Sequence, residues 1–110
     1  MKDDRIYLEH ILEAIKKIET YLTDKSSADL EQDYMMQDAV IRNLSIIGEA
    51  ANNLSEQFIA AHPEIDWRQV VGMRNRLIHD YFGVDLDTVW KTVTHDLPPL
   101  KKFLETKLKT

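Results

Sequence analysis

Residues able to do chemistry gather in one short segment, which contains Arg74, Asn75 and His79. Asn75 and His79 are spaced i, i+4, so a helix would make them neighbours on one face. A neutral imidazole acts as a general base or acid near neutral pH. A guanidinium binds a phosphoryl group through its fork of donors. The segment therefore predicts chemistry on a phosphodiester with no metal ion and no cofactor.

An ideal helical wheel places Arg74 in the middle of an apolar face. At about 100° per residue, six apolar neighbours fall within about 60° of it, namely Trp67, Val70, Val71, Leu77, Ile78 and Tyr81. Such a guanidinium must be paired or must line a pocket, because burying it alone is costly. Gly72, on the side of His79, leaves room for a ligand or another backbone. Spacing alone leaves two structural roles open: a hydrogen-bonding core histidine, and an arginine clamped on a carboxylate such as Glu49.

The rest of the sequence predicts the helices that hold this segment. Apolar periodicity and capping residues predict helices over residues 3–22, 26–33, 34–61, 67–82, from 85 onward, and 97–108. Asp66, Asp85 and Asp96 are the expected N-caps of the last three. Pro98 and Pro99 are expected to stop or kink the helix that Asp85 begins.

Apolar stripes indicate which helix faces are buried. The first helix carries Ile6, Ile11, Ile15, Ile18 and Leu22, and the long middle helix carries Val40, Leu44, Ile47, Ala51, Leu54 and Phe58. A second strip on the middle helix consists of Ala39, Ile46 and Ala50. Either another helix of the same chain covers that strip, or a second copy of the protein does.

Composition restricts the fold class. The 110 residues include 44 % hydrophobic types but only 3 Gly and 3 Pro, too few turn residues for a β-sandwich and too many apolar ones for disorder. Cysteine is absent, which excludes disulfides and thiolate metal sites. A net charge of -5 argues against broad attachment to nucleic acid. No apolar run could span a membrane, so we expect the protein in the cytoplasm. The length and the helical patterns predict one domain over residues 1–110, an all-α up-down helical bundle.

Residues 74–81, Arg-Asn-Arg-Leu-Ile-His-Asp-Tyr, resemble the Arg-x-x-x-x-His-x-Tyr signature of the HepT-like branch of the HEPN superfamily. The flanking residues fit the same pattern. Gly72-Met73 precede the signature, residues 82–85 and Val89-Trp90 follow it, and Ile47-Gly48-Glu49-Ala50 resemble the family's upstream helix. The resemblance extends over nearly the whole chain.

The resemblance implies a small helical toxin paired with an MNT-type nucleotidyltransferase antitoxin. HEPN ribonucleases cut RNA without a metal, and two protomers join their motifs across a dimer cleft. By position in the motif, Arg74 would contact the scissile phosphate, His79 would transfer protons, and Tyr81 would receive AMP from the antitoxin. Asn75 would support the site through hydrogen bonds, and Glu49 is a candidate for orienting Arg74. RNA, the antitoxin and a second copy of the chain are thus the expected partners.

A different function class also fits the sequence. The chain could be a non-enzymatic regulatory or nucleotide-presenting subunit of a nucleotidyltransferase, with Arg74 and His79 binding a nucleotide phosphate or the partner's surface. On an ideal wheel His79 lies about 160° from Tyr81. The motif residues therefore meet one ligand only if the helix frays or a partner protomer supplies one of them.

Overall fold

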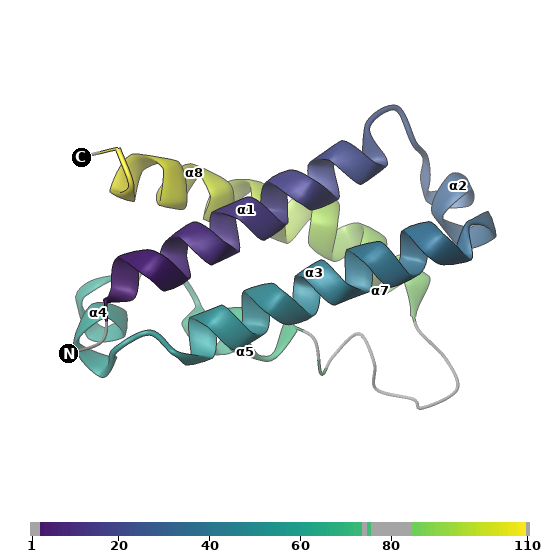
Figure 1. The fold of residues 1–110 in the computed structure, drawn as a ribbon. Coiled ribbons are helices and arrows are strands. Elements are labelled where there is room, and N and C mark those ends of the chain that lie inside the picture. Colours follow the sequence, from purple (N-terminus) through teal and green to yellow (C-terminus); the bar gives the residue numbers. More distant parts are fainter. Residues whose placement is uncertain (1–2, 74, 76–84, 110) are drawn as a thin grey trace.

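The computed structural model describes residues 3–73, 75 and 85–109, and every regular element in that part of the chain is helical. The elements are α1 (Asp4–Leu22), α2 (Ser27–Gln32), α3 (Tyr34–Asn52), α4 (Glu56–Ala61), α5 (Trp67–Val71), α7 (Leu86–Lys91), the π-helical turn η1 (Thr92–Asp96) and α8 (Leu97–Lys107). Helices α1 and α3 lie side by side in opposite directions, and α8 packs along α1 (Figure 1). The predicted all-α bundle is confirmed. Among these helices none has both the length and the apolar composition needed to cross a bilayer.

Several helices begin at the predicted positions, where N-cap side chains accept hydrogen bonds from the first turn. Ser26 and Asp29 form a reciprocal capping box at α2, with the Ser26 N–H donating to the Asp29 carboxylate at 2.8 Å. That backbone hydrogen bond lowers the pKa of Asp29. Asp66 caps α5, and Asp85 caps α7. The Thr88 hydroxyl donates to the Asp85 carboxylate at 2.7 Å and lowers its pKa.

The predicted apolar stripes of α1 and α3 form the centre of the core. Fully buried side chains on these two helices include Ile11, Ile15, Ile18, Val40, Leu44 and Ile47. The prediction is wrong for Ile6, which is 47 % exposed. Ile6 precedes Ile11 by five residues, which is about 140° around an ideal helix, so it faces away from the core.

The helix predicted over residues 34–61 is two helices, α3 and α4. The break follows from a contact with the start of α1, where the Asp4 carboxylate accepts the Ser55 N–H at 2.8 Å and the Ser55 hydroxyl at 2.7 Å. The Ser55 oxygen in turn accepts the Phe58 N–H at 3.1 Å and caps α4. A residue 51 positions away in the sequence therefore fixes where the second helix begins.

The helix that Asp85 begins does not stop at the prolines. It continues through η1 into α8, where Pro98 and Pro99 occupy the first turn and need no N–H partner. The Leu97 N–H donates to the Thr92 carbonyl, a wider turn than in an α-helix. Asp96 lies inside this turn with helical backbone and caps nothing, so the predicted N-cap is wrong.

The wide turn keeps one face of the helix on the core. Thr92 and Leu97 are both buried although five positions apart. An ideal α-helix would separate them by about 140°. The π-helical turn takes up the extra residue, and Leu100 and Leu104 continue the buried line along α8.

Four rings hold α4, α5 and α8 together. Phe103 of α8 packs edge-on against Phe58, His62 and Trp67, with centroid distances of 6.5, 5.5 and 5.8 Å. The Trp67 indole donates to the His62 carbonyl at 3.0 Å, and the His62 Nδ1–H donates to the Phe58 carbonyl at 2.9 Å. This cluster anchors the first residue of α5 to the bundle.

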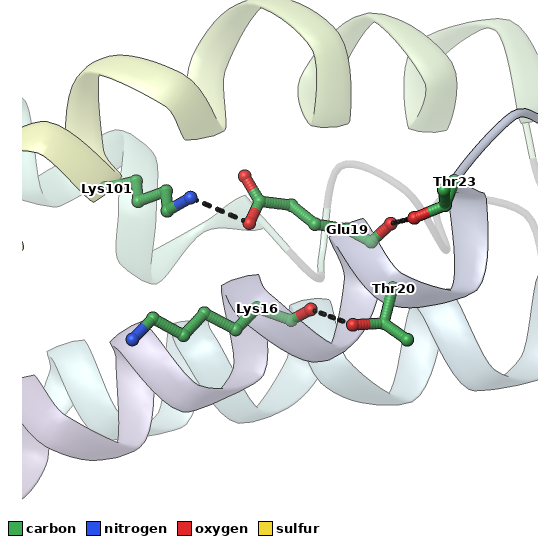
Figure 2. A network of polar contacts seen from close by, with 5 residues as sticks. All are labelled: Lys16, Glu19, Thr20, Thr23 and Lys101. Carbon is green, nitrogen blue, oxygen red and sulfur yellow. Dashed lines mark hydrogen bonds and ion pairs between the residues drawn. The ribbon is translucent and has the colours of Figure 1, made fainter.

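Polar contacts join α1 and α8 at the surface. The Lys101 ammonium lies 2.9 Å from the Glu19 carboxylate (Figure 2), and this hydrogen bond raises the pKa of Lys101. The hydroxyls of Thr20 and Thr23 donate to backbone carbonyls within α1. Solvent-exposed pairs of this kind contribute little to stability. The buried stripes, not these ions, hold the bundle together.

The second apolar strip of α3 is partly covered within the chain. Ala50 is 6 % exposed, and Ile46 and Ala39 are half-buried. Ile46 lines a surface hollow together with His10 and Ala14 of α1. Within the described part of the chain, Ala50 is thus covered, whereas Ala39 and Ile46 stay partly exposed.

Candidate functional site

The described residues include two of the five predicted site residues. Glu49 lies in α3, and Asn75 follows α5; both are exposed. Arg74, His79 and Tyr81 lie outside the described residues. Their roles therefore stay predictions.

The helix predicted from Trp67 to about residue 82 is interrupted at Gly72. Helix α5 ends at Val71 and Gly72 forms a turn, after which Met73 and Asn75 again have helical backbone. The later part of that predicted helix lies outside the described residues.

The predicted apolar face of this segment is confirmed for Trp67 and Val70, and one residue outside that face is buried as well. Trp67, Val70 and Met73 are each no more than 5 % exposed, and Val71 is half-buried. Met73 lies outside the predicted face and follows the turn at Gly72, beyond which an ideal helical wheel no longer applies.

Gly48 brings α3 and α5 unusually close together. A Cβ atom added at Gly48 would lie 3.0 Å from the Val71 carbonyl oxygen and 3.5 Å from that of Val70. Contacts of 3.4–4 Å are ordinary, so a side chain here would require the Val71 backbone to shift by a few tenths of an ångström. The residue type at position 48 therefore affects how closely the end of α5 packs against α3.

A surface hollow of about 170 Å³ lies beside this contact, and we call it the α3–α5 hollow. Its lining residues are Ser45, Gly48, Glu49, Asn52, Val71 and Asn75. The structure thus brings together Glu49 and Asn75, the two supporting residues that it describes. Sequence reasoning missed Ser45 and Asn52. Their spacing to Gly48 and Glu49, i, i+3, i+4 and i+7, marks a polar helix face that could have identified them.

Comparison with known proteins places the chain in a family. The family described as "Ribonuclease HepT-like" matches residues 11–106, nearly all of the described fold. This chain belongs to the HepT-like ribonuclease family. The HepT-like match includes α3, α5 and the whole segment from Arg74 to Tyr81.

Three relatives show how widely the HepT-like sequence occurs. A Thermococcus cleftensis protein named "Probable ribonuclease HepT" is 50 % identical over 90 % of this chain and 90 % of its own length. The "mRNA nuclease HepT" of Shewanella oneidensis is 29 % identical over 86 % of this chain and 88 % of its own. A Methanocaldococcus jannaschii protein, named for a gamma-glutamylcyclotransferase and a putative RNase, is 48 % identical over 92 % of this chain. The match spans only 46 % of that longer relative. No solved structure gives a significant match.

We predict that Gly48→Ala destabilises the protein. Alanine gains about 1 kcal/mol in helix propensity, but overpacking costs about 1–3 kcal/mol, and the buried Trp67 and Val70 prevent α5 from moving away. Thermal unfolding followed by circular dichroism should show a Tm several degrees lower. Arg42→Ala, at an exposed position of α3, is the control and should leave the Tm nearly unchanged. A higher Tm for Gly48→Ala would contradict a tight contact between α3 and α5.

Proposed function

We propose that this chain is a metal-independent endoribonuclease and the toxin of a toxin–antitoxin pair. The observation that carries the proposal is the Arg74-to-Tyr81 motif within a chain that belongs to the HepT-like ribonuclease family. The relatives named as HepT nucleases and the placement of Glu49 and Asn75 in one hollow support it.

The proposed reaction is a transesterification within RNA. His79 of one protomer takes the proton from a ribose 2′-hydroxyl, and the 2′-oxygen attacks the adjacent phosphorus. The bond to the 5′-oxygen breaks, and the partner's His79 gives that oxygen a proton. The products are a 2′,3′-cyclic phosphate and a free 5′-hydroxyl, so one proton is taken up and one is returned.

Arg74 is proposed to stabilise the charge that develops on the phosphorane. Removing one such preorganised donor typically costs about 3–4 kcal/mol of transition-state stabilisation. General acid–base catalysis by His79 adds about 10²–10⁴-fold. Asn75 would support these groups from the α3–α5 hollow, which Glu49, the candidate for orienting Arg74, also lines.

The proposed antitoxin is an MNT-type nucleotidyltransferase that transfers AMP from ATP to the Tyr81 hydroxyl, releasing pyrophosphate. The transfer adds a phosphodiester and a bulky base within the motif. The negatively charged phosphodiester would pair with the Arg74 guanidinium and so exclude the RNA phosphate. Inhibition would then need no refolding.

We predict that the active protein is a homodimer. The proposed mechanism needs two histidines, one as base and one as acid. Because Ala50 of the second strip of α3 is already buried within the chain, the prediction rests mainly on this chemistry. Light scattering should give twice the 12.9 kDa mass of the chain. A monomer at micromolar concentration that still cleaves RNA would rule out the two-histidine mechanism.

We predict that Arg74→Ala and His79→Ala each reduce RNA cleavage at least about 100-fold without loss of helicity. Arg74→Lys should fail as well, because an ammonium cannot reproduce the guanidinium fork. Arg68→Ala and His95→Ala, at exposed positions elsewhere, are matched controls and should retain cleavage.

Near-full cleavage by His79→Ala, in a preparation shown to be free of contaminating nucleases, would make the catalytic assignment wrong. Wild-type protein that binds the nucleotidyltransferase but cuts no RNA would instead favour the non-enzymatic subunit.

We predict that Tyr81→Phe keeps ribonuclease activity but escapes neutralisation by the antitoxin and ATP. Its hydroxyl has no proposed catalytic step, yet it is the proposed AMP acceptor. Mass spectrometry of the wild type after incubation with the antitoxin and ATP should show added AMP on the peptide that contains Tyr81. An unchanged mass together with lost toxicity would mean that the antitoxin works by binding alone.

A further inference from the structure

The α3–α5 hollow is lined mostly by polar residues. Ser45, Glu49 and Asn52 come from one face of α3, and Asn75 follows α5. Gly48 and Val71 also line the hollow, and the missing Cβ of Gly48 leaves helix backbone close to the Val71 carbonyl. The hollow can therefore present several hydrogen-bonding groups to a single small ligand.

Three polar side chains of this hollow form no hydrogen bond or ion pair within the described part of the chain. Within residues 3–73, 75 and 85–109, no hydrogen bond or ion pair engages the Glu49 carboxylate or the side-chain amides of Asn52 and Asn75. Other asparagines of the same region behave differently. Asn43 donates to the Ala39 carbonyl at 2.9 Å, and Asn53 donates to the Glu49 carbonyl at 2.9 Å. The side-chain amide of Asn52 donates no such hydrogen bond to its own helix, and Asn52 lines the hollow instead.

The size and charge of the hollow select the part of an RNA that fits. A volume of about 170 Å³ equals the liquid volume of about six water molecules, which suits a single nucleobase. The Glu49 carboxylate repels a phosphate but accepts hydrogen bonds from base amino and imino groups. Guanine offers two adjacent donors, N1–H and N2–H, to the two oxygens of one carboxylate. The guanine O6 accepts a hydrogen bond from an asparagine amide. Uracil has no amino group, so it cannot make the two-donor contact with the carboxylate.

The hollow is also next to the proposed phosphate contact along the chain. Asn75 directly follows Arg74, and consecutive Cα atoms are about 3.8 Å apart. A nucleotide whose phosphate meets Arg74 would therefore have its base within reach of Asn75. This proximity favours a base of the substrate itself over an unrelated small molecule.

We propose that the α3–α5 hollow binds a guanine base next to the scissile phosphate, with Glu49 accepting from N1–H and N2–H, and Asn52 and Asn75 completing the contact. This inference rests on the proposed ribonuclease function. It makes Glu49 a base-binding residue, in place of the predicted role of orienting Arg74.

Cleavage of RNAs that differ in one base tests the proposal. In otherwise uracil-only oligonucleotides, one guanine should direct cleavage to its neighbouring bond, and adenine or cytosine should do so less well. Glu49→Gln replaces one acceptor with a donor, so the preference for guanine over the other bases should fall about tenfold or more. Glu31→Gln, an exposed change in α2 at the far end of α3 from α5 (Figure 1), is the matched control and should keep the preference.

Two outcomes of this experiment would overturn the proposal. Wild-type protein with no guanine preference would show that the hollow does not read a base. An equal loss of cleavage next to every base in Glu49→Gln would show that Glu49 acts through Arg74.

A binding measurement separates this proposal from the ribonuclease proposal. Guanosine monophosphate, but not uridine monophosphate, should shift the side-chain amide NMR signals of Asn52 and Asn75, and Glu49→Gln should abolish the shift. Shifts without any RNA cleavage would support the guanine site while refuting the ribonuclease. No shift with guanosine monophosphate would overturn the guanine site even if RNA is cut, as expected if a second copy of the chain covers the hollow.

Discussion

The contact between α3 and α5 at Gly48 is the constraint on which the site depends. It is a backbone contact, made possible only because position 48 carries no side chain. Two further contacts fix neighbouring elements: the ring cluster around Trp67 anchors the start of α5, and the Asp4 carboxylate joins the start of α1 to Ser55 after α3. The α3–α5 hollow, which Gly48 and Val71 both line, follows from this geometry.

Features determined by neighbouring residues could be predicted from the sequence. The caps at Ser26, Asp66 and Asp85 form hydrogen bonds with residues three positions away, so the local pattern suffices. The buried stripes of α1 and α3 follow from helical periodicity alone. Features set by distant contacts could not be predicted in this way. The break before Ser55 depends on Asp4, and the π-helical turn depends on which side chains reach the core.

The residues of the candidate site fall into the same two groups: those identified from the local sequence and those identified only from the fold. Arg74 and His79 stand out by residue type, spacing and motif, and Tyr81 by the motif alone, all of which are readable without a fold. Glu49 was linked to the motif by resemblance, and only the folded chain shows it beside Asn75 on one hollow. Asn52 shares that hollow, but a polar residue on a helix face usually needs no explanation beyond contact with solvent. Asn52 can be recognised as a site residue only when the fold shows that Asn75 lines the same hollow.

The π-helical turn before Pro98 has a consequence for how the chain tolerates changes in length. It is in effect a one-residue insertion within a helix, placed where the core line from Thr92 to Leu97 can absorb it. A chain shorter by one residue between these positions would reach the same core with an unbroken α-helix. Single-residue gaps at this point between homologous sequences are therefore compatible with one fold, whereas a gap between Leu97 and Leu104 would turn the buried line of α8 toward solvent.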